Sequence, residues 1–160
     1  MIDDQVKGAL LVALLIMGLL AGGSYWVEHR VTEPFSELGV LGPNQKIGDY
    51  PTTLLVNQNF TLFLYVGDHE GRAMYYDIRV KLGDNSSVVN GTVSLDSPVL
   101  ADYRVILTDN QTWLQPINLS IDQPGTNLRL VFEMWVYNTT AANFTYHSLY
   151  DQLWFNVTTA

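Results

Sequence analysis

Large apolar residues alternate with polar ones along much of the chain beyond residue 50. In the clearest example, Tyr76–Leu82, every second residue is apolar, whereas Asp77, Arg79 and Lys81 are charged. Because successive side chains of a β-strand point to opposite faces, this pattern predicts strands with one face against a core. The same alternation marks three further segments, Phe60–Val66, Leu128–Val136 and Leu153–Val157.

Weaker patterns add five candidate strands, separated by turn signals rich in Gly, Pro, Asn and Asp. They are Ser36–Leu41, Thr52–Val56, Val88–Leu95, Tyr103–Leu107 and Trp113–Ile121. No stretch after Val27 has a helical period. Seven to nine short strands at this spacing predict an all-β domain over residues 35–160, an immunoglobulin-like antiparallel β-sandwich.

The N-terminal part of the chain has a different character, because no charged residue occurs from Gly8 to Val27. Twenty helical residues rise about 30 Å, which matches the hydrocarbon core of a bilayer. We therefore expect a transmembrane helix over residues 8–27, after a short N-terminal segment (1–7) and before a polar stalk (28–34). The alternative is a buried core helix, although such helices are rarely apolar on all sides over this length.

Two short motifs leave the processing of this segment open. Ala21-Gly22-Gly23-Ser24 could serve as a signal-peptidase site, although the acidic Asp3 and Asp4 are unusual before such a signal. Lys7-Gly8-Ala9 before an apolar run resembles the processing site of archaeal type IV pilin precursors. Whether the chain is cut after Gly8 is not decided by the sequence.

Small residues recur every fourth position on the predicted helix. The pairs are Ala9 with Ala13 and Gly18 with Gly22. Such pairs let a second membrane helix approach closely. They are candidate helix-packing residues, although Gly and Ala are also frequent in membrane helices in general.

Asparagines occur mainly in the N-glycosylation motif Asn-X-Ser/Thr. The chain has 11 Asn and 21 Ser plus Thr, so about one or two such triplets would arise by chance. Eight occur, none with Pro in the middle: Asn59, Asn85, Asn90, Asn110, Asn118, Asn138, Asn143 and Asn156. All follow the apolar segment, which predicts a cytoplasmic N-terminus and an extracellular C-terminal domain carrying N-glycans. An Asn/Thr-rich surface without glycans is the alternative.

The predicted strands provide a test of this interpretation. Asn59, Asn90, Asn118 and Asn156 each fall, with the hydroxyl residue two positions on, opposite the inward apolar set. Asn138 falls in the inward phase, so its strand should have ended there. Five aromatic residues also point outward, either covering one another or forming a patch for a partner: Phe63, Tyr65, Trp135, Tyr137 and Trp154.

Composition narrows the functional classes. The net charge of −8 opposes binding to nucleic acid, and the absence of Cys removes disulfides and thiolate chemistry. The histidines His29, His69 and His147 match no metal-site spacing, and no nucleophile elbow, phosphate loop or dinucleotide fingerprint is present. Asp68-His69-Glu70 is more typical of a polar turn than of a cation site. We expect no enzyme activity, no metal and no cofactor.

Several segments in a fixed order resemble an archaeal, membrane-attached family defined only as a domain of unknown function, number sixteen-sixteen in its series. They are Phe35–Asn44, Asp49–Pro51, Asp68–Gly71 with Tyr75-Tyr76, Trp113–Pro116, Pro124-Gly125 with Leu128–Trp135, and Gln152–Thr158. The resemblance covers nearly all of the outer domain and implies no activity. Members often carry several membrane helices before this domain, whereas this chain has one apolar segment.

Three functions remain after these exclusions. The first is a structural or accessory subunit of a membrane or surface-layer complex, held in lipid and contacting other envelope proteins. The second is a pilin-like or archaellum-stator-like filament component. The third is an extracellular module that binds a glycan or solute through the outward aromatic residues.

Overall fold

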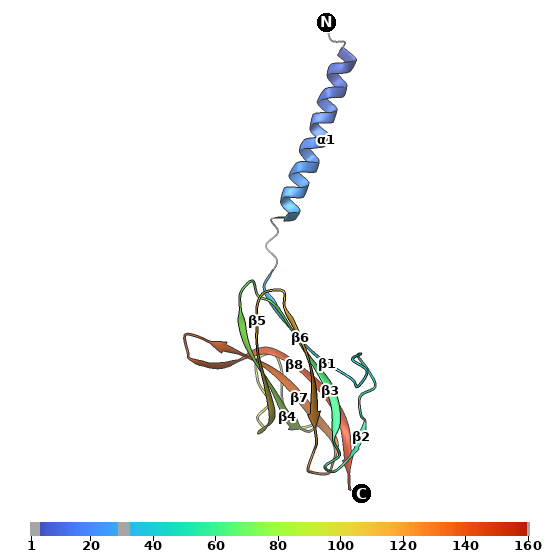
Figure 1. Ribbon diagram of the computed structural model, residues 1–160, viewed down its shortest axis with the longest axis vertical. Helices are drawn as coiled ribbons and strands as arrows, with labels where there is room; N and C mark the ends of the chain where they lie inside the picture. Colours follow the sequence, from blue (N-terminus) through green and yellow to red (C-terminus); the bar gives the residue numbers. More distant parts are fainter. Residues whose placement is uncertain (1–3, 29–32, 160) are drawn as a thin grey trace. The chain divides into compact units, whose positions relative to one another are not determined.

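The computed structural model describes residues 4–28 and 33–159 (Figure 1). The chain divides into two compact units, Met1–Glu33 and Pro34–Ala160, and each is described by itself. His29 lies outside the described residues.

The first unit contains the helix α1 (Asp4–Glu28). The side chains described in it, those of Gly8 and of residues 12–25, are exposed, including the predicted packing residues Ala13, Gly18 and Gly22. The side chain of Ala9 lies outside the described part. Ser24 donates its hydroxyl hydrogen bond to the helix's own carbonyl oxygens, at Leu20 (3.0 Å) and Ala21 (3.1 Å).

Across residues 4–28 and 33–159, no helix combines the length and the hydropathy needed to cross a membrane.

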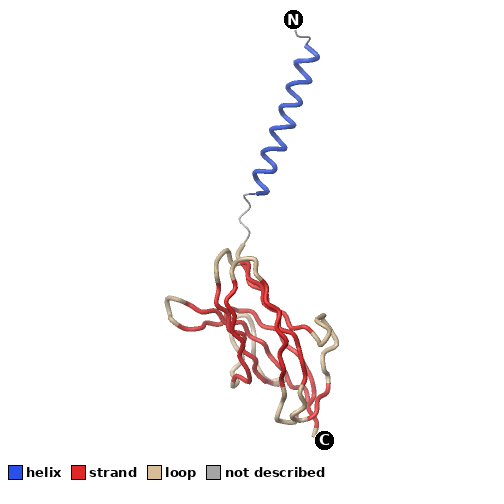
Figure 2. The backbone as a smooth tube through the Cα atoms, viewed as in Figure 1, coloured by secondary structure: helices blue, strands red, loops and turns tan. Residues whose placement is uncertain are grey.

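The second unit is a β-sandwich, which confirms the predicted all-β class (Figure 2). One sheet has the order β1-β3-β6, from β1 (Phe35–Leu41), β3 (Phe60–His69) and β6 (Thr112–Leu119). The other has the order β2-β8-β7-β4-β5. Its strands are β2 (Thr53–Leu55), β4 (Met74–Gly83), β5 (Val99–Leu107), β7 (Gly125–Asn138) and β8 (Asn143–Thr158).

The pairing departs from the prediction in one respect. The sandwich is not entirely antiparallel, because β2 runs parallel to β8, with Leu54 opposite Val157. The first edge strand of the larger sheet thus pairs with the last strand of the domain. This pairing joins segments about 100 residues apart in sequence, which alternation alone does not reveal.

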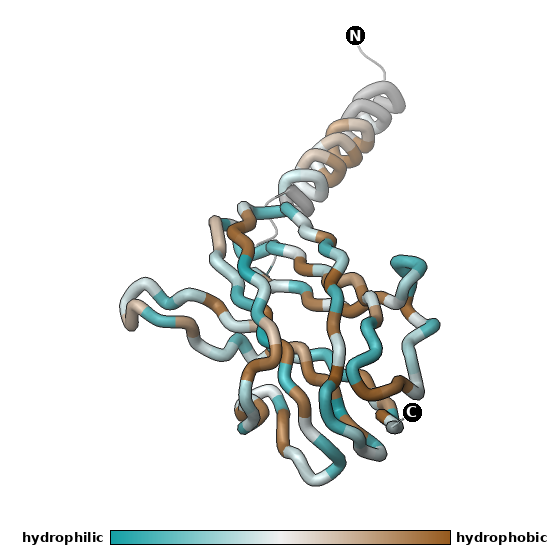
Figure 3. The backbone as a smooth tube through the Cα atoms, turned by 60° about the horizontal axis from the view of Figure 1, so that its bottom comes forward, coloured by the Kyte–Doolittle hydropathy of each residue, from teal (hydrophilic) through white to brown (hydrophobic). Residues whose placement is uncertain are grey.

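The core lies between the sheets and consists of the inward residues that alternation predicted. Along the strands, apolar and polar residues alternate in Figure 3. Phe60, the first residue of β3, and Leu128, the fourth residue of β7, are half-buried. The remaining predicted core residues are buried: Leu62, Leu64, Val66, Tyr76, Ile78, Val80, Leu82, Leu130, Phe132, Met134, Val136, Leu153, Phe155 and Val157.

The predicted strand Val88–Leu95 is wrong, because this segment forms no strand. It belongs to a long connection between β4 and β5, residues 84–98, which we call the strap. The Oδ1 atom of Asn90 accepts hydrogen bonds from the backbone N–H groups of Thr92 (2.8 Å) and Val93 (2.9 Å). These bonds close a turn in the middle of the segment, and a turn of this kind competes with strand pairing.

The strap covers part of the outer face of the larger sheet. Val89 and Leu95 pack against Val131 of β7 in a second, smaller apolar cluster, flanked by Tyr150. Strand β8 also begins earlier than predicted, at Asn143, so that β7 and β8 form a long hairpin. The irregular alternation of residues 143–152, which pair with a register shift near Glu133, explains why the sequence did not reveal this part.

Candidate functional site

The structure places the sequon asparagines on the surface of the sandwich. Seven are exposed, and Asn156 is half-buried. Asn138 is the last residue of β7 and is exposed, as the alternation required. Asn85 and Asn90 lie in the strap, and Asn143 begins β8. The acceptor amides are therefore distributed over several faces of the domain, and none belongs to the core.

The hydrogen bonds of these asparagines use mainly the carbonyl oxygen. Asn138 Oδ1 accepts from the backbone N–H of Thr140 (2.9 Å), Asn118 Oδ1 from the hydroxyl of Thr61 (2.6 Å), and Asn156 Oδ1 from the backbone N–H of Asn127 (2.8 Å). Asn110 differs, because its Nδ2 donates to Asp109 (2.8 Å). Within the described part of the chain, the amide nitrogens of the other seven sequons make no hydrogen bond.

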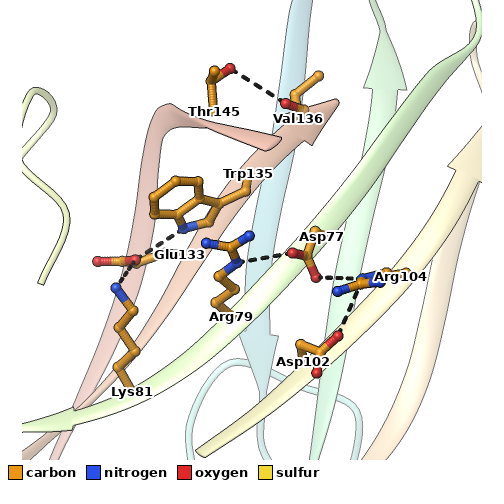
Figure 4. Close-up of polar contacts among 9 residues, drawn as sticks. All are labelled: Asp77, Arg79, Lys81, Asp102, Arg104, Glu133, Trp135, Val136 and Thr145. Atoms are coloured by element: carbon orange, nitrogen blue, oxygen red, sulfur yellow. Dashed lines mark hydrogen bonds and ion pairs between the residues drawn. The ribbon is translucent and has the colours of Figure 1, made fainter. Parts of the chain in front are cut away.

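A layer of charged and aromatic side chains occupies the outer face of the five-stranded sheet (Figure 4). Asp77 of β4 is fully buried between two guanidinium groups, with Arg79 Nε at 2.9 Å from Oδ2 and Arg104 Nε at 3.3 Å from Oδ1. Asp102, next to Arg104 on β5, lies 3.2 Å from the same Nε. Alternation placed Asp77 on this face, but it did not predict that the face would be covered.

Trp135 forms the centre of this layer. The guanidinium of Arg79 lies over its ring at 4.0 Å from the centroid, and its Nε1 donates to Glu133 Oε2 (3.1 Å). Glu133 is fully buried and also pairs with Lys81, with Nζ–Oε2 at 3.1 Å. A buried carboxylate with an ion pair and several donors is well satisfied.

The same charged residues hold the strap on the sheet. Lys81 Nζ donates to the carbonyl oxygen of Leu95 (2.7 Å), and Leu95 N–H donates to Glu133 Oε1. Further along, Arg129 donates to the Ser87 carbonyl oxygen (3.0 Å). Burial of Lys81 and Glu133 thus has a structural cause, since each satisfies backbone groups of the covering segment.

The remaining outward aromatic residues lie beside partners on neighbouring strands. Tyr137 packs against Tyr75 and Phe144, with ring centroids 6.0 and 5.4 Å away. Trp154 is exposed and faces Arg129 at 5.4 Å. These contacts support the interpretation that the rings cover one another across strands.

The two remaining outward aromatic residues, Phe63 and Tyr65, lie on β3 of the other sheet. Tyr65 donates to Glu37 Oε2 (2.8 Å), and this hydrogen bond, together with burial, raises the pKa of Tyr65. Phe63 is half-buried on the same face of β3.

A cavity of about 440 Å³ opens beside the Tyr75–Tyr137 pair. Glu70, Arg72 and His147 contribute charged or titratable groups to its lining. The cavity therefore combines aromatic surface with both signs of charge.

Next to this cavity lies a polar cluster assembled from distant parts of the chain. The Ser36 hydroxyl donates to Glu70 Oε1 (2.7 Å) and lies 3.0 Å from the Tyr76 hydroxyl and 3.2 Å from His147 Nε2. Burial is the main cause that raises the pKa of Tyr76 to about 12, and the nearby carboxylates of Asp68 and Glu70 add to it. Sequence reasoning missed this cluster, because no spacing links its members.

The cluster does not have the geometry of a Ser-His-acid triad. In a triad, one ring nitrogen of the histidine faces the hydroxyl and the other faces the acid. Here His147 Nε2 lies nearest both Ser36 (3.2 Å) and Glu70 Oε1 (3.5 Å), and the Ser36 hydroxyl donates directly to the acid. This arrangement therefore differs from that of a catalytic triad.

Two residues of the predicted polar turn, Asp68 and His69, are instead the last two residues of β3, and Glu70 follows the strand. Asp68 is fully buried, His69 stacks on Phe35 with ring centroids 4.6 Å apart, and Glu70 faces Ser36. Asp68 Oδ1 accepts from the Glu70 backbone N–H (2.9 Å), and its Oδ2 has no hydrogen-bond partner among the described residues. No group of His, Asp and Glu side chains in residues 4–28 and 33–159 has the arrangement of a metal site.

These observations define a class of protein: an all-β sandwich domain with exposed sequon asparagines and a charged–aromatic outer face. The family described as Domain of unknown function (DUF1616) matches residues 30–158, and the chain belongs to this family. The family to which the sequence was compared is thereby confirmed. None of the curated protein sequences matches the chain significantly.

Solved structures with a similar arrangement of strands share little sequence with the chain. The CARDB domain of the PF1109 protein from Pyrococcus furiosus, in complex with di-metal ions, is 12% identical; the match covers 79% of this chain and 90% of that domain, with a TM-score of 0.48. A β-glucosidase from Listeria innocua is 14% identical over 78% of this chain and 16% of the enzyme (TM-score 0.47). Spo0M, a sporulation control protein from Bacillus subtilis, is 9% identical over 76% and 49%, respectively (TM-score 0.46).

Proposed function

We propose that this chain is a membrane-anchored, N-glycosylated protein of an archaeal cell envelope, acting as a structural or accessory subunit of a membrane or surface-layer complex. In this proposal, residues 8–27 lie in lipid, the N-terminus lies inside, and an immunoglobulin-like sandwich lies outside. Neither enzyme activity nor a bound metal is part of it.

The observation that carries the proposal is the exposure of the sequon asparagines. Seven are exposed, and seven of the eight amide nitrogens have no competing hydrogen bond in the described part of the chain. The sugar is attached to this nitrogen, so the folded domain leaves it accessible. Glycans would also hydrate a surface on a chain with only 15% charged residues.

The proposed anchor rests on the sequence of residues 8–27, which contain no charge over the length of a bilayer-spanning helix. Within it, Ser24 satisfies its hydroxyl on the backbone of α1. A polar side chain bonded in this way is tolerated in lipid, where no water replaces the missing partner.

The test uses the full chain, produced in cells that N-glycosylate Asn-X-Ser/Thr sites. Glycopeptide mass spectrometry should find sugar on the sequon asparagines and none on Asn57 or Asn127, which are exposed but lie outside sequons. Carbonate washing of the membranes should leave the chain in the pellet. If the sequons carried no sugar, the proposal of a glycoprotein would be rejected. If carbonate released the chain, the proposed membrane anchor would be rejected.

A second candidate function is the binding of a glycan or solute, which the cavity beside Tyr75 and Tyr137 favours. Titration with neutral and amino sugars, followed by tyrosine fluorescence, would test it. Saturable quenching that Tyr137→Ala abolishes is expected for a site here. Equal responses of the wild type and Tyr137→Ala would reject it.

A further inference from the structure

Strand β5 (Val99–Leu107) is an edge of the five-stranded sheet, with β4 as its partner on one side. On its other side, the backbone groups of residues 99–107 make no hydrogen bond to any part of the chain that the structure describes. Its side chains Leu100 and Ile106 are large, apolar and 47% and 66% exposed. Leu100 lies at an irregularity of the β4–β5 pairing, between Val99 opposite Lys81 and Ala101 opposite Val80. An edge of this kind offers a row of donors and acceptors to another strand.

The other three edges of the sandwich are protected. On β1, the Val40 N–H donates to Asp151 Oδ2 (3.1 Å), and the Val40 carbonyl oxygen accepts from the Tyr50 hydroxyl (2.7 Å). Strand β6 contains Pro116, which has no N–H to offer, and β2 is only three residues long. The contrast shows that the open edge of β5 is not a general property of this fold.

The sequence of β5 is complementary to itself when a second copy runs antiparallel with Tyr103 opposite Tyr103. In this register Asp102 lies opposite Arg104 of the second copy, and Arg104 lies opposite its Asp102. Leu100 and Ile106 likewise lie opposite each other at both ends of the pair of strands. We propose that β5 pairs with β5 of a second copy of this chain, so that the two five-stranded sheets form one continuous sheet across a two-fold axis.

The charges select this register against its neighbours. A shift of two residues one way places Asp102 opposite Asp102, and the same shift the other way places Arg104 opposite Arg104. Like charges directly opposite destabilise a pair of strands. A shift of one residue turns every side chain to the wrong face. Each copy supplies an Asp and an Arg at reciprocal positions. A second copy of this chain can therefore pair with the open edge, and no other protein is needed.

The outer face also supports the pairing. Arg104 is half exposed, although it already contacts Asp77 and Asp102 of its own chain. A guanidinium has five N–H donors, so donors remain for a carboxylate of the second copy. In addition, no sequon occurs between Asn90 and Asn110, so the proposed glycans would leave β5 bare. This last point rests on the proposed function, whereas the pairing itself does not.

The absence of Cys from the chain allows a direct test of the register. Two full-length variants, Leu100→Cys and Ile106→Cys, carry different tags and are oxidised in detergent micelles, separately and mixed. Directly opposite residues have Cβ atoms about 4.5–5.5 Å apart, close to the reach of a disulfide, whereas Leu100 lies roughly 20 Å from Leu100 of the second copy. We therefore expect a disulfide-linked dimer in the mixture and little in either variant alone.

A matched control is Leu114→Cys, an apolar residue with 43% exposure on the edge strand β6 of the other sheet. It should not cross-link with either variant. Equal cross-linking in all combinations would indicate random collisions, and no cross-link in the mixture would exclude the register; either result would overturn the proposal. If Leu100→Cys cross-linked only to a different protein, the proposal would also be overturned, because another partner would then occupy the edge of β5.

A charge variant gives a second measurement that needs no cysteine. Asp102→Lys places Lys opposite Arg104 of the second copy and should weaken dimerisation at least tenfold in analytical ultracentrifugation. Asp122→Lys, at an exposed position outside the strands, makes the same change in charge as a control. Equal dimerisation of the two folded variants would contradict the pairing. Because β5 takes part in neither glycosylation nor anchoring, a bare or soluble chain could still dimerise, so the two proposals fail separately.

Discussion

The Nζ atom of Lys81 lies 3.1 Å from Oε2 of Glu133 beneath the strap, where both side chains are buried. The pair lies on the outer face of the sheet, which alternation marks as polar. It joins β4, β7 and the strap through one carboxylate, which also accepts from the indole of Trp135. An ion pair thus performs the task that apolar contacts perform on the inner face.

Removal of the Glu133 carboxylate should destabilise the domain. Glu133→Ala leaves the Lys81 charge and the Leu95 N–H without their buried partner, so we expect a loss of about 3–5 kcal/mol in the free energy of unfolding. The double variant Lys81→Met, Glu133→Leu removes both charges and should lose less than Glu133→Ala. Urea unfolding measures both values. An equal or larger loss in the double variant would contradict the electrostatic explanation.

The occupancy of the sequons should differ from site to site. Asn110 donates its Nδ2 to Asp109, and its Oδ1 lies 3.1 Å from His69 Nδ1. By contrast, the amide nitrogen of Asn90 makes no hydrogen bond to any residue that the structure describes. We expect lower glycan occupancy at Asn110 than at Asn90, and a rise at Asn110 in the variant Asp109→Ala. Glycopeptide mass spectrometry gives both occupancies. Similar glycan occupancies at Asn110 and Asn90 in the wild type would show that these hydrogen bonds do not control glycosylation.

The stability of the domain should decrease in alkali through Tyr76. Its pKa is raised to about 12, chiefly by burial, whereas the unfolded chain loses the same proton near pH 10. Between these values the unfolded state binds fewer protons than the folded state, so the free energy of unfolding falls as pH rises from about 10 to 12. The contribution is complete below pH 10.

Unfolding in urea at several pH values between 9 and 12 measures this slope. Tyr76→Phe removes the titrating hydroxyl and should reduce the slope, although it also removes the contact with Ser36. The wild type and Tyr76→Phe are compared under the same conditions. The idea fails if the two proteins have the same slope.

Two glycines of similar sequence context should respond differently to substitution. A Cβ atom at Gly42 would collide with the backbone carbonyl oxygen of Gly48, which cannot move without opening the loop after β1. A Cβ atom at Gly39 would meet Tyr65 at 3.8 Å, an ordinary contact. We expect Gly42→Ala to lower the free energy of unfolding by about 1–3 kcal/mol and Gly39→Ala to change it little. Thermal unfolding measures both; a neutral Gly42→Ala would contradict the structure of this loop.

The sequence predicted the inner face of the sandwich well, because alternation reports burial directly. Ile78 and Phe132 could be assigned to the core from their spacing alone. Burial on the outer face could not be predicted in this way. Asp77 and Glu133 are as buried as the core residues, although alternation marks them as polar. Their burial depends on the strap and on Arg79 and Arg104, which the sequence does not bring together.

The candidate sites divide in the same way. Sequons are local triplets, so Asn59 or Asn118 can be found by reading the chain. The cluster of Ser36, Tyr76 and His147 is assembled from three strands of two sheets, and only the pairing of those strands reveals it. The strand Val88–Leu95 was mispredicted for a related reason, because β-forming residues can also pack as an irregular cover.

The position of β8 between β2 and β7 has a consequence for how the domain is made. Strand β8 pairs with both β2 and β7, and its residues Leu153, Phe155 and Val157 belong to the core. A nascent chain that stops before Asn143 therefore leaves β2 without a partner, one edge of β7 unpaired and an apolar interior open. Native structure is thus acquired late and cooperatively, and a prematurely terminated product remains recognisable to proteases as unfinished.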